Sequence, residues 1–306
     1  MGANLTPRFG ILVLQTDGWS AIEERVRRYE AAGLDAAWVA DHFVHYADPT
    51  GPWLEAWTLL AGLAARTGRI RLGPLVSHAI YRNPAVLARQ AMTLDQLSGG
   101  RLVLGLGTGA SDYDWRIACG QEPWPFAERV ERFGEAVEIV DRLLRGETTT
   151  YGGKYFRVAD GTLQPGSIQR PRPPLTVAAS GPRMVRLAAR FADTWITEGN
   201  YRELWGRDPT AADVLRLTRE RGELLSREAT ALGRDPATIR RAFLAGYSPG
   251  LEEPWSSAEA FEDFLGRYGE IGCTEFVLPE PRAEDAAAFE RVAGSIIPAL
   301  RRTART

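Results

Sequence analysis

The stretch that decides the fold is residues 69–109, RIRLGPLVSHAIYRNPAVLARQAMTLDQLSGGRLVLGLGTG. Apolar runs at its two ends predict strands at 70–77 and 101–109. Between them, Asn83-Pro84 is a typical helix start and Gly99-Gly100 a typical helix end. The order strand, helix, strand predicts two parallel strands joined by a helical crossover.

The same alternation continues along the rest of the chain, where apolar runs again precede amphipathic segments. Further strands are predicted at 9–16, 36–42, 175–180, 193–197, 239–248 and 274–281. Further helices are predicted before Gly33, at 54–67, 126–144, 182–191, 209–232 and 257–270, and around 289–296. Eight such units predict an α/β fold, a single (β/α)8 TIM barrel over residues 1–306. Two stacked Rossmann domains are the alternative, but no linker or shift in composition divides the chain.

This alternation is interrupted by insertions after strands 3-4 and before strand 5, which together cover about residues 110–174. The first part of this inserted region, 111–125, is predicted to be a loop because it contains Cys-Gly and two prolines. A small hairpin is predicted around Gly152-Gly153, followed by a rigid extended segment that leads into the strand at 175–180.

The composition is that of an ordinary soluble globular protein, with 306 residues, 44% hydrophobic and 25% charged residues and a formal net charge of −2. This net charge does not indicate the basic surface that binds nucleic acid or an anionic membrane. No apolar run approaches the roughly 18 residues of a membrane span, and the first residues do not resemble a signal peptide. We therefore expect a cytoplasmic protein without nucleic-acid or membrane partners.

Scarce lysine, histidine and cysteine exclude several kinds of chemistry. Lys154 is the only lysine, and it lies in a turn, so Schiff-base and pyridoxal enzymes are excluded. With only three histidines in the chain, a hydrolase with several histidine-bound metals is close to excluded. Cys119 and Cys273 have no metal-ligand spacing, and we expect no metal.

The active site of a barrel lies at the C-terminal ends of its strands, so the residues there are the site candidates. The sharpest pair is Asp41-His42, a carboxylate beside an imidazole that can move a proton near neutral pH. The alternative is that Asp41 caps a loop and that His42 is structural. His78, after the third strand, is either a proton donor or a loop histidine. Other strand ends carry Thr108-Gly109, Ser180-Gly181 and Thr197-Glu198.

Two further motifs are weaker. Gly105, Gly107 and Ala110 match the G-x-G-x-x-G/A spacing of dinucleotide binders. In those proteins a helix follows the glycines at once, whereas a loop is predicted here, so we interpret the match as a coincidence. Gly181-Pro182 before a helix leaves free N–H groups suited to a phosphate, although the same pair often starts helices without a ligand. Three tryptophans in predicted loops could form an aromatic wall for a planar ligand: Trp53, Trp115 and Trp124.

In order and spacing, these motifs resemble the bacterial luciferase-like superfamily, and within it most the deazaflavin (F420)-dependent oxidoreductases. The resemblance covers residues 9 to 200. It is carried by GLDAAWVADHF (33–43), by the segment from RNP (82–84) through SGGRLVLGLGTG (98–109), by PRPPLTVAASGP (171–182) and by AARFADTWIT (188–197).

The resemblance implies a TIM barrel with coenzyme F420, or alternatively FMN, lying across its mouth. It implies that His42 handles protons at the reacting face, that Asp41 contacts the polar edge of the ring, and that a cis peptide at Leu75-Val76 supports the ring. The other residues implied to bind the cofactor line the ring or hold its tail phosphate: Thr108, Gly109, Ala179, Ser180, Gly181, Pro182, Arg183 and Met184.

The chain departs from the family's sugar-phosphate dehydrogenases at two positions. They have a glutamate where this chain has Ala110, and a lysine where it has Asn200. We therefore expect a neutral or hydrophobic organic substrate, in a pocket with His78, Trp115, Glu198 and Asn200.

Four functions remain from the sequence. The first is hydride transfer between reduced F420 and the substrate, and the second is an FMNH2-dependent monooxygenase that uses O2 and a separate flavin reductase. The others are a barrel that binds without turnover and a metal-assisted isomerase or hydrolase using Asp41, His42 and His78. Relatives of this kind commonly dimerise, so we expect a homodimer.

Overall fold

The computed structural model describes residues 6–45, 47–78, 81–109, 112–120, 122–206, 208–246 and 252–303. Its chain forms two compact units. Unit 1 consists of Met1–Leu12, Arg28–Ala36 and Val177–Thr306, and unit 2 of Val13–Arg27 and Ala37–Thr176. Within the described ranges, no helix has the length and apolar character needed to cross a membrane.

The main sheet has nine strands in the order β3-β2-β1-β11-β10-β9-β8-β5-β4. They are β1 (Arg8–Val13), β2 (Ala36–Val39), β3 (Arg71–Pro74), β4 (Ser77–His78), β5 (Leu104–Gly107), β8 (Leu175–Ala178), β9 (Thr194–Thr197), β10 (Arg240–Leu244) and β11 (Glu275–Pro279). Strands β3 and β4 stand at the two ends of this order although they follow each other in the chain, as in a sheet that closes on itself. The predicted α/β fold, a TIM barrel, is confirmed.

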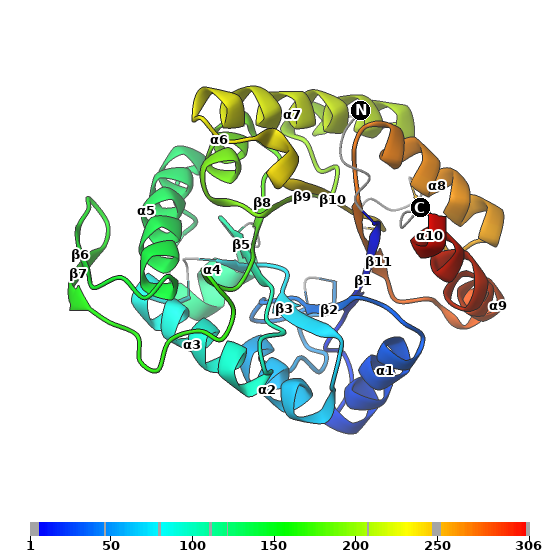
Figure 1. Cartoon of the computed structure of the whole chain (residues 1–306), viewed down its shortest axis with the longest axis horizontal. Helices are drawn as coiled ribbons and strands as arrows, with labels where there is room; N and C mark the ends of the chain where they lie inside the picture. Colours follow the sequence, from blue (N-terminus) through cyan, green and yellow to red (C-terminus); the bar gives the residue numbers. More distant parts are fainter. Residues whose placement is uncertain are drawn as a thin grey trace. The chain divides into compact units, whose positions relative to one another are not determined.

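In unit 2, helices lie outside the strands (Figure 1). They are α2 (Ala56–Arg66), α3 (Pro84–Leu97) and α5 (Phe126–Leu144), and α1 (Trp19–Ala31) has residues in both units. Helix α4 (Asp112–Cys119) instead lies against the chain that follows β2, because Asp114 bonds to His42 and Phe43. The predicted hairpin is confirmed as the antiparallel pair β6 (Thr149–Gly152) and β7 (Arg157–Gly161), beyond α5.

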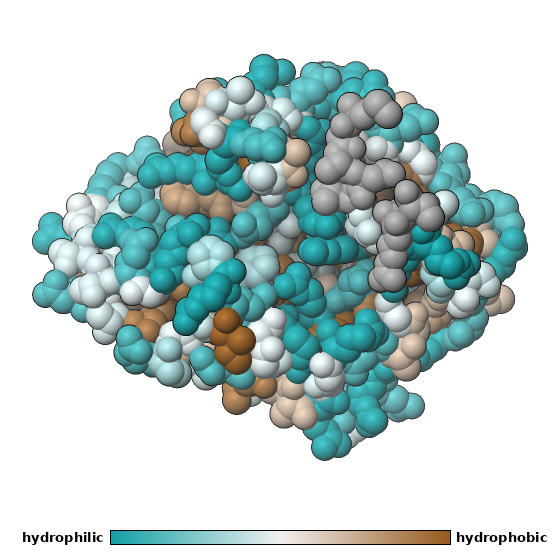
Figure 2. Space-filling model, viewed as in Figure 1, coloured by the Kyte–Doolittle hydropathy of each residue, from teal (hydrophilic) through white to brown (hydrophobic). Residues whose placement is uncertain are grey.

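In unit 1, the parallel pairs β1-β11, β11-β10 and β10-β9 are covered by the remaining helices. These are α6 (Pro182–Phe191), α7 (Ala211–Ala231), α8 (Ala258–Glu270), α9 (Ala286–Arg291) and α10 (Ile297–Thr303), the last two joined by a π-helical turn at Val292–Ile296. The face shown in Figure 2 is mostly hydrophilic, with hydrophobic residues in small separate patches.

The local sequence explains the start and end of α3. The Asn83 side chain accepts a hydrogen bond of 2.9 Å from the Ala85 N–H, and Pro84 occupies the first turn, where its missing N–H costs nothing. After Leu97 the chain turns through Gly99 and Gly100, whose φ angles of 66° and 83° favour glycine.

The glycines of β3 and β5 allow two strands to approach closely. A Cβ atom at Gly105 would overlap the carbonyl oxygen of Pro74, and one at Gly73 would overlap the carbonyl oxygen of Val103. Gly105 is therefore explained by strand packing, which supports the interpretation that the dinucleotide-like spacing is a coincidence.

Two predictions about local structure were wrong. The third predicted strand is divided into β3 and β4 at the Leu75-Val76 peptide, which is cis. The loop predicted at 111–125 contains helix α4, which runs up to Cys119. Only Gly120, where φ is 62°, and the two prolines follow the helix and end it.

Candidate active site

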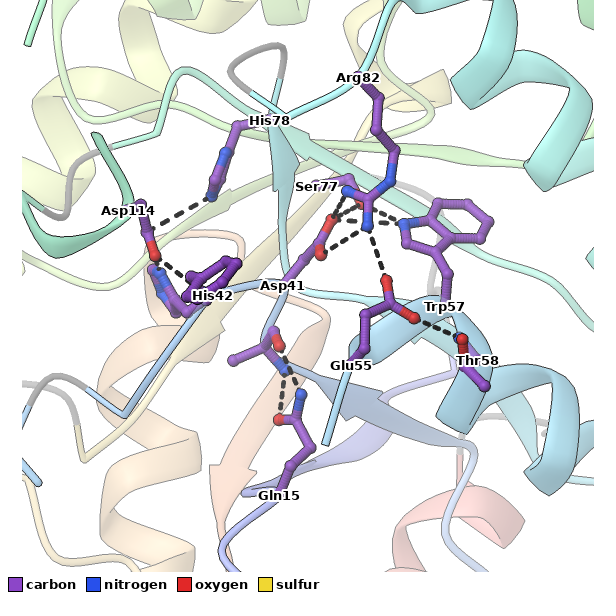
Figure 3. A network of polar contacts seen from close by, with 12 residues as sticks. Gln15, Asp41, His42, Glu55, Trp57, Thr58, Ser77, His78, Arg82 and Asp114 are labelled. Atoms are coloured by element: carbon purple, nitrogen blue, oxygen red, sulfur yellow. Dashed lines mark hydrogen bonds and ion pairs between the residues drawn. The ribbon is translucent and has the colours of Figure 1, made fainter. Parts of the chain in front are cut away.

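Asp41 is the centre of a buried polar network in unit 2 (Figure 3). One of its carboxylate oxygens accepts hydrogen bonds from the Ser77 hydroxyl (2.5 Å), from Arg82 Nη1 (2.6 Å) and from Trp57 Nε1 (3.3 Å). The other accepts from Arg82 Nη2 at 3.2 Å. Asp41 is only 3% exposed, so the guanidinium supplies the counter-charge that a buried carboxylate requires.

Arg82 connects this network to helix α2. Its Nη2 also donates to Glu55 at 2.8 Å, and the other Glu55 oxygen caps α2 by accepting from the Thr58 N–H at 2.7 Å. Burial by itself raises the pKa of Glu55, but the hydrogen bonds from Thr58 and the charge of Arg82 outweigh it and hold the pKa below its usual value. The network thus joins the chain after β2, strand β4 and the start of α2.

His42 forms a second polar centre with Asp114, a residue of α4. His42 Nδ1 lies 2.6 Å from Asp114 Oδ2, and the Phe43 N–H donates to Asp114 Oδ1 at 2.8 Å. Asp114 is fully buried, whereas the His42 side chain is 21% exposed. Burial by itself raises the pKa of Asp114, but the hydrogen bonds from His42 and Phe43 prevail and lower it. An ionised Asp114 holds the proton on Nδ1 and leaves Nε2 as the proton acceptor.

The backbone around His42 is held from two sides. Trp53 Nε1 donates to the His42 carbonyl oxygen at 2.8 Å. The buried Gln15 side chain donates to the Ala40 carbonyl oxygen at 2.6 Å and accepts from the Ala40 N–H at 3.1 Å. These contacts hold the backbone at Ala40 and His42 and so restrict the orientation of the His42 side chain.

The ring of His78 lies beside this pair. This residue ends β4, where it pairs with Gly107 of β5, and its side chain is 1% exposed. Neither of its ring nitrogens makes a hydrogen bond within the described part of the chain. Its ring centroid is 5.9 Å from that of His42 and 4.6 Å from that of Tyr81. Burial lowers the pKa of His78 to about 4, so the imidazole is neutral at neutral pH.

The structure brings together three of the predicted site residues, Asp41, His42 and His78, and adds others that the sequence analysis missed. Asp114 lies in the Asp-Tyr-Asp run of the segment predicted to be a loop, so its helical position was not foreseen. Ser77 was expected beside His78 at the end of the third strand, whereas the other partners of Asp41, Arg82 and Trp57, were missed.

The predicted cofactor residues of unit 2 follow strands β3 and β5. The cis peptide expected at Leu75-Val76 is confirmed. Thr108 and Gly109 come directly after β5, and the Gly109 carbonyl oxygen accepts from Arg129 Nη1 at 3.2 Å. Ala110 lies outside the described residues. Contacts of these residues with a cofactor stay a prediction.

Trp115 differs from its predicted position in an open loop. It lies on α4 and is fully buried, in edge-to-face contact with Trp124 at 4.5 Å between ring centroids. The guanidinium of Arg129 lies 5.3 Å from its ring centroid. In this structure its ring is enclosed by protein and does not line an open pocket.

The remaining predicted residues belong to unit 1. Gly181 precedes α6, no side chain caps the helix there, and Pro182 begins it, so N–H groups of the first turn stay available. Ala179 and Met184 are buried, whereas Gly181, Pro182 and Arg183 are exposed. The Ser180 carbonyl oxygen accepts from Arg221 Nε at 3.0 Å.

The two substrate candidates of unit 1 follow β9. Glu198 is half-buried, and Asn200 is exposed, with its side-chain oxygen accepting from Trp205 Nε1 at 2.8 Å. Their contact with a substrate stays a prediction.

Comparison with known proteins agrees with this fold. The family model of the luciferase-like monooxygenases matches residues 1–291. An F420-dependent glucose-6-phosphate dehydrogenase from Beutenbergia cavernae is 32% identical over 311 residues, which cover 89% of this chain and 90% of that protein. A 5,10-methylenetetrahydromethanopterin reductase from Archaeoglobus fulgidus is 32% identical over 188 residues, 61% of this chain and 51% of that protein.

Solved structures show the same fold. An F420-dependent secondary alcohol dehydrogenase, in complex with an F420-acetone adduct, aligns with a TM-score of 0.80 and 21% identity, covering 97% of this chain and 99% of its own. The coenzyme F420-dependent tetrahydromethanopterin reductase from Methanopyrus kandleri aligns with a TM-score of 0.77 and 19% identity, covering 97% and 100%. The fold and the matched sequence define a luciferase-like α/β barrel enzyme. This chain belongs to the luciferase-like monooxygenase family.

Proposed function

We propose that this chain is an F420-dependent oxidoreductase that transfers a hydride between the cofactor and a neutral organic substrate, an alcohol or the corresponding carbonyl compound. The similarity to the Beutenbergia cavernae F420-dependent dehydrogenase, over nine tenths of both chains, supports the cofactor. The single observation that carries the chemistry is the His42–Asp114 pair, with 2.6 Å between Nδ1 and Oδ2. Interconversion of an alcohol and a carbonyl compound requires a group that accepts or donates a proton, in addition to the hydride transfer.

The residues present fit such a cofactor. Bound F420 would supply a carbon centre that accepts or gives up a hydride. The first turn of α6 offers N–H groups without a side-chain cap, which would hold an anionic tail at Ser180 to Met184. Thr108 and Gly109, at the end of β5, would line the ring.

His42 would exchange a proton with the substrate oxygen. Asp114 keeps the Nδ1 proton in place, so that Nε2 is the atom that gives or takes the proton. Asp114 would be a positioning residue, and it supplies from α4 a carboxylate that the chain lacks at position 110. Asp41 is fully engaged by Arg82, Ser77 and Trp57, so its contact with the ring would use a carboxylate that is already hydrogen-bonded.

The places of the sole lysine and of Asn200 favour a neutral substrate over a sugar phosphate. The sole lysine, Lys154, lies on the β6–β7 hairpin and pairs with Glu131 at 3.0 Å. At the position where sugar-phosphate dehydrogenases of the family carry a lysine, Asn200 bonds to Trp205 instead. We expect alcohols and ketones to be converted, and glucose 6-phosphate to be a poor substrate.

The test is a titration of the purified chain with F420 and with FMN, followed by turnover assays. We expect micromolar binding of F420, and a change in its absorbance when a panel of alcohols or ketones is added. Micromolar binding of FMN without binding of F420 would refute the proposal and favour the FMNH2-dependent monooxygenase.

The assembly of the enzyme is also part of the proposal. We propose a cytoplasmic homodimer that receives reduced cofactor from a separate reductase. Light scattering at assay concentration measures the mass of the particle, and a monomer would contradict the dimer.

A further inference from the structure

His42, His78 and Asp114 form a compact group of possible metal ligands in unit 2 (Figure 3). Each offers one ligand atom, and these atoms all lie within 4.8 Å of one another. Asp114 Oδ2 is the shared neighbour, 2.6 Å from His42 Nδ1 and 3.9 Å from His78 Nε2. Both imidazoles thus face the same carboxylate oxygen.

The strongest sign of a missing ligand is the buried ring of His78. Its two nitrogens make no hydrogen bond among the described residues, and the side chain is 1% exposed. Burying a polar group without a partner is costly, and native proteins rarely leave one unpaired. A cation between His78 and Asp114 would give this ring a partner.

The distances suit a small divalent cation. With bonds of about 2.0–2.1 Å to nitrogen and oxygen in a tetrahedral arrangement, ligand atoms lie about 3.3 Å apart. The two distances to Asp114 Oδ2 fall on either side of this value, so modest side-chain rotations satisfy both. Two imidazoles with one carboxylate suit zinc and similar transition metals, whereas magnesium and calcium prefer oxygen ligands alone.

A cation can reach this group from the side of His42. The His42 side chain is 21% exposed, while the other two ligands are buried. Three protein ligands leave the fourth tetrahedral position to water or to another small ligand. Asp41 belongs to the Arg82 network and is not a member of this group, which differs from the set of Asp41, His42 and His78 considered from the sequence.

We propose that His42, His78 and Asp114 bind one divalent cation of the zinc class, and that this cation inhibits the enzyme. The cation would replace the proton shared by His42 and Asp114. The inhibition rests on the proposed function, because it requires that His42 act in proton transfer, whereas the binding does not.

The binding is tested on the full chain without added cofactor. Calorimetric titration with Zn²⁺ is expected to give one site per chain, Co²⁺ to give the visible absorption of a tetrahedral complex, and Mg²⁺ to give no binding. His78→Gln and His42→Gln should each weaken Zn²⁺ binding about 10-fold or more. The matched control is His45→Gln, which removes the third histidine, in a loop outside the group, and should leave binding unchanged.

Several results would overturn the binding. These are absence of stoichiometric Zn²⁺ binding, equal affinity in the wild type and both variants, and a loss caused by His45→Gln alone. Circular dichroism of each variant checks that it is folded, and the partly exposed His42 provides a variant that does not disturb the core.

Inhibition is tested separately from binding. Stoichiometric Zn²⁺ should abolish turnover, and a chelator should restore it. If Zn²⁺ binds but F420 supports no turnover, the proposed function fails and the metal site stands. If Zn²⁺ binds without slowing an active enzyme, the inhibitory role is refuted.

Discussion

Replacing Asp114 by asparagine tests the positioning of His42 with almost no change in shape. In the wild type, Asp114 Oδ1 accepts from the Phe43 N–H at 2.8 Å, and Oδ2 lies 2.6 Å from His42 Nδ1. If the asparagine oxygen keeps the bond to Phe43, its NH2 group faces Nδ1 and can only donate. The imidazole must then carry its proton on Nε2, the atom that should be free to accept one.

The size of the effect follows from the bond that is lost. A hydrogen bond to a charged group contributes about 1.5–3 kcal/mol, and each 1.4 kcal/mol is a factor of ten in rate. The fully buried position of Asp114 leaves no water to compensate. We therefore expect kcat to fall about 10-fold to 150-fold, while the affinity for F420 stays within about 3-fold because Asp114 is not among the proposed cofactor-binding residues.

The assay follows the absorbance of F420 with a converted substrate, and fluorescence quenching gives the affinity for F420. The matched control is Glu122→Gln, an exposed carboxylate of the same insertion, which should keep the wild-type kcat. A fall in kcat of less than about 3-fold in folded Asp114→Asn would refute the positioning role. Loss of F420 binding in parallel with kcat would instead assign Asp114 to the cofactor site.

Three other predictions concern the stability of the folded chain. Arg82→Met leaves Asp41 buried without its cation and should lower the free energy of unfolding by about 3–5 kcal/mol; urea denaturation measures this, and the double variant with Asp41→Asn should recover part of the loss. Gly105→Ala places a methyl group against a neighbouring carbonyl and should cost about 1–3 kcal/mol, seen as a lower melting temperature, whereas an unchanged melting temperature would contradict the close approach of β5. Hydrogen bonds from two arginines outweigh burial and lower the pKa of Asp141, so its contribution to stability is present above the usual carboxyl pKa and is lost as the pH falls through the lowered one. Asp141→Asn should therefore destabilise the chain at pH 7 but less at pH 3, and equal destabilisation at both would refute the ion pairs.

Much of the fold could be predicted because strands and helices alternate with strong local signals. The helix predicted at 126–144 has the same bounds in the structure, since its apolar face repeats at helical spacing and Gly146 follows its end. Strand ends were less predictable, because apolar residues also flank the regular strand. The strand predicted at 101–109 is continuous only over Leu104–Gly107, although Leu102 forms an isolated bridge with Leu72.

The candidate site was predictable only in part. Asp41 and His42 were found because they end a strand, and a barrel collects such residues at one mouth. Asp114 was missed because its partner, His42, lies 72 positions away in sequence, and no local pattern records such a contact. Arg82 was visible in the Y-R-N-P motif, but its ion pair with Asp41 depends on the folded chain.

The sole lysine gives this enzyme an unusual experimental handle. Lys154 is 70% exposed on the β6–β7 hairpin, and every other basic residue except the three histidines is an arginine, which does not react with amine-selective reagents. Apart from the α-amino group, a fluorophore with an activated ester would therefore label one position, on the hairpin. The emission of the dye at Lys154 would report on the hairpin during turnover, without any substitution in the chain.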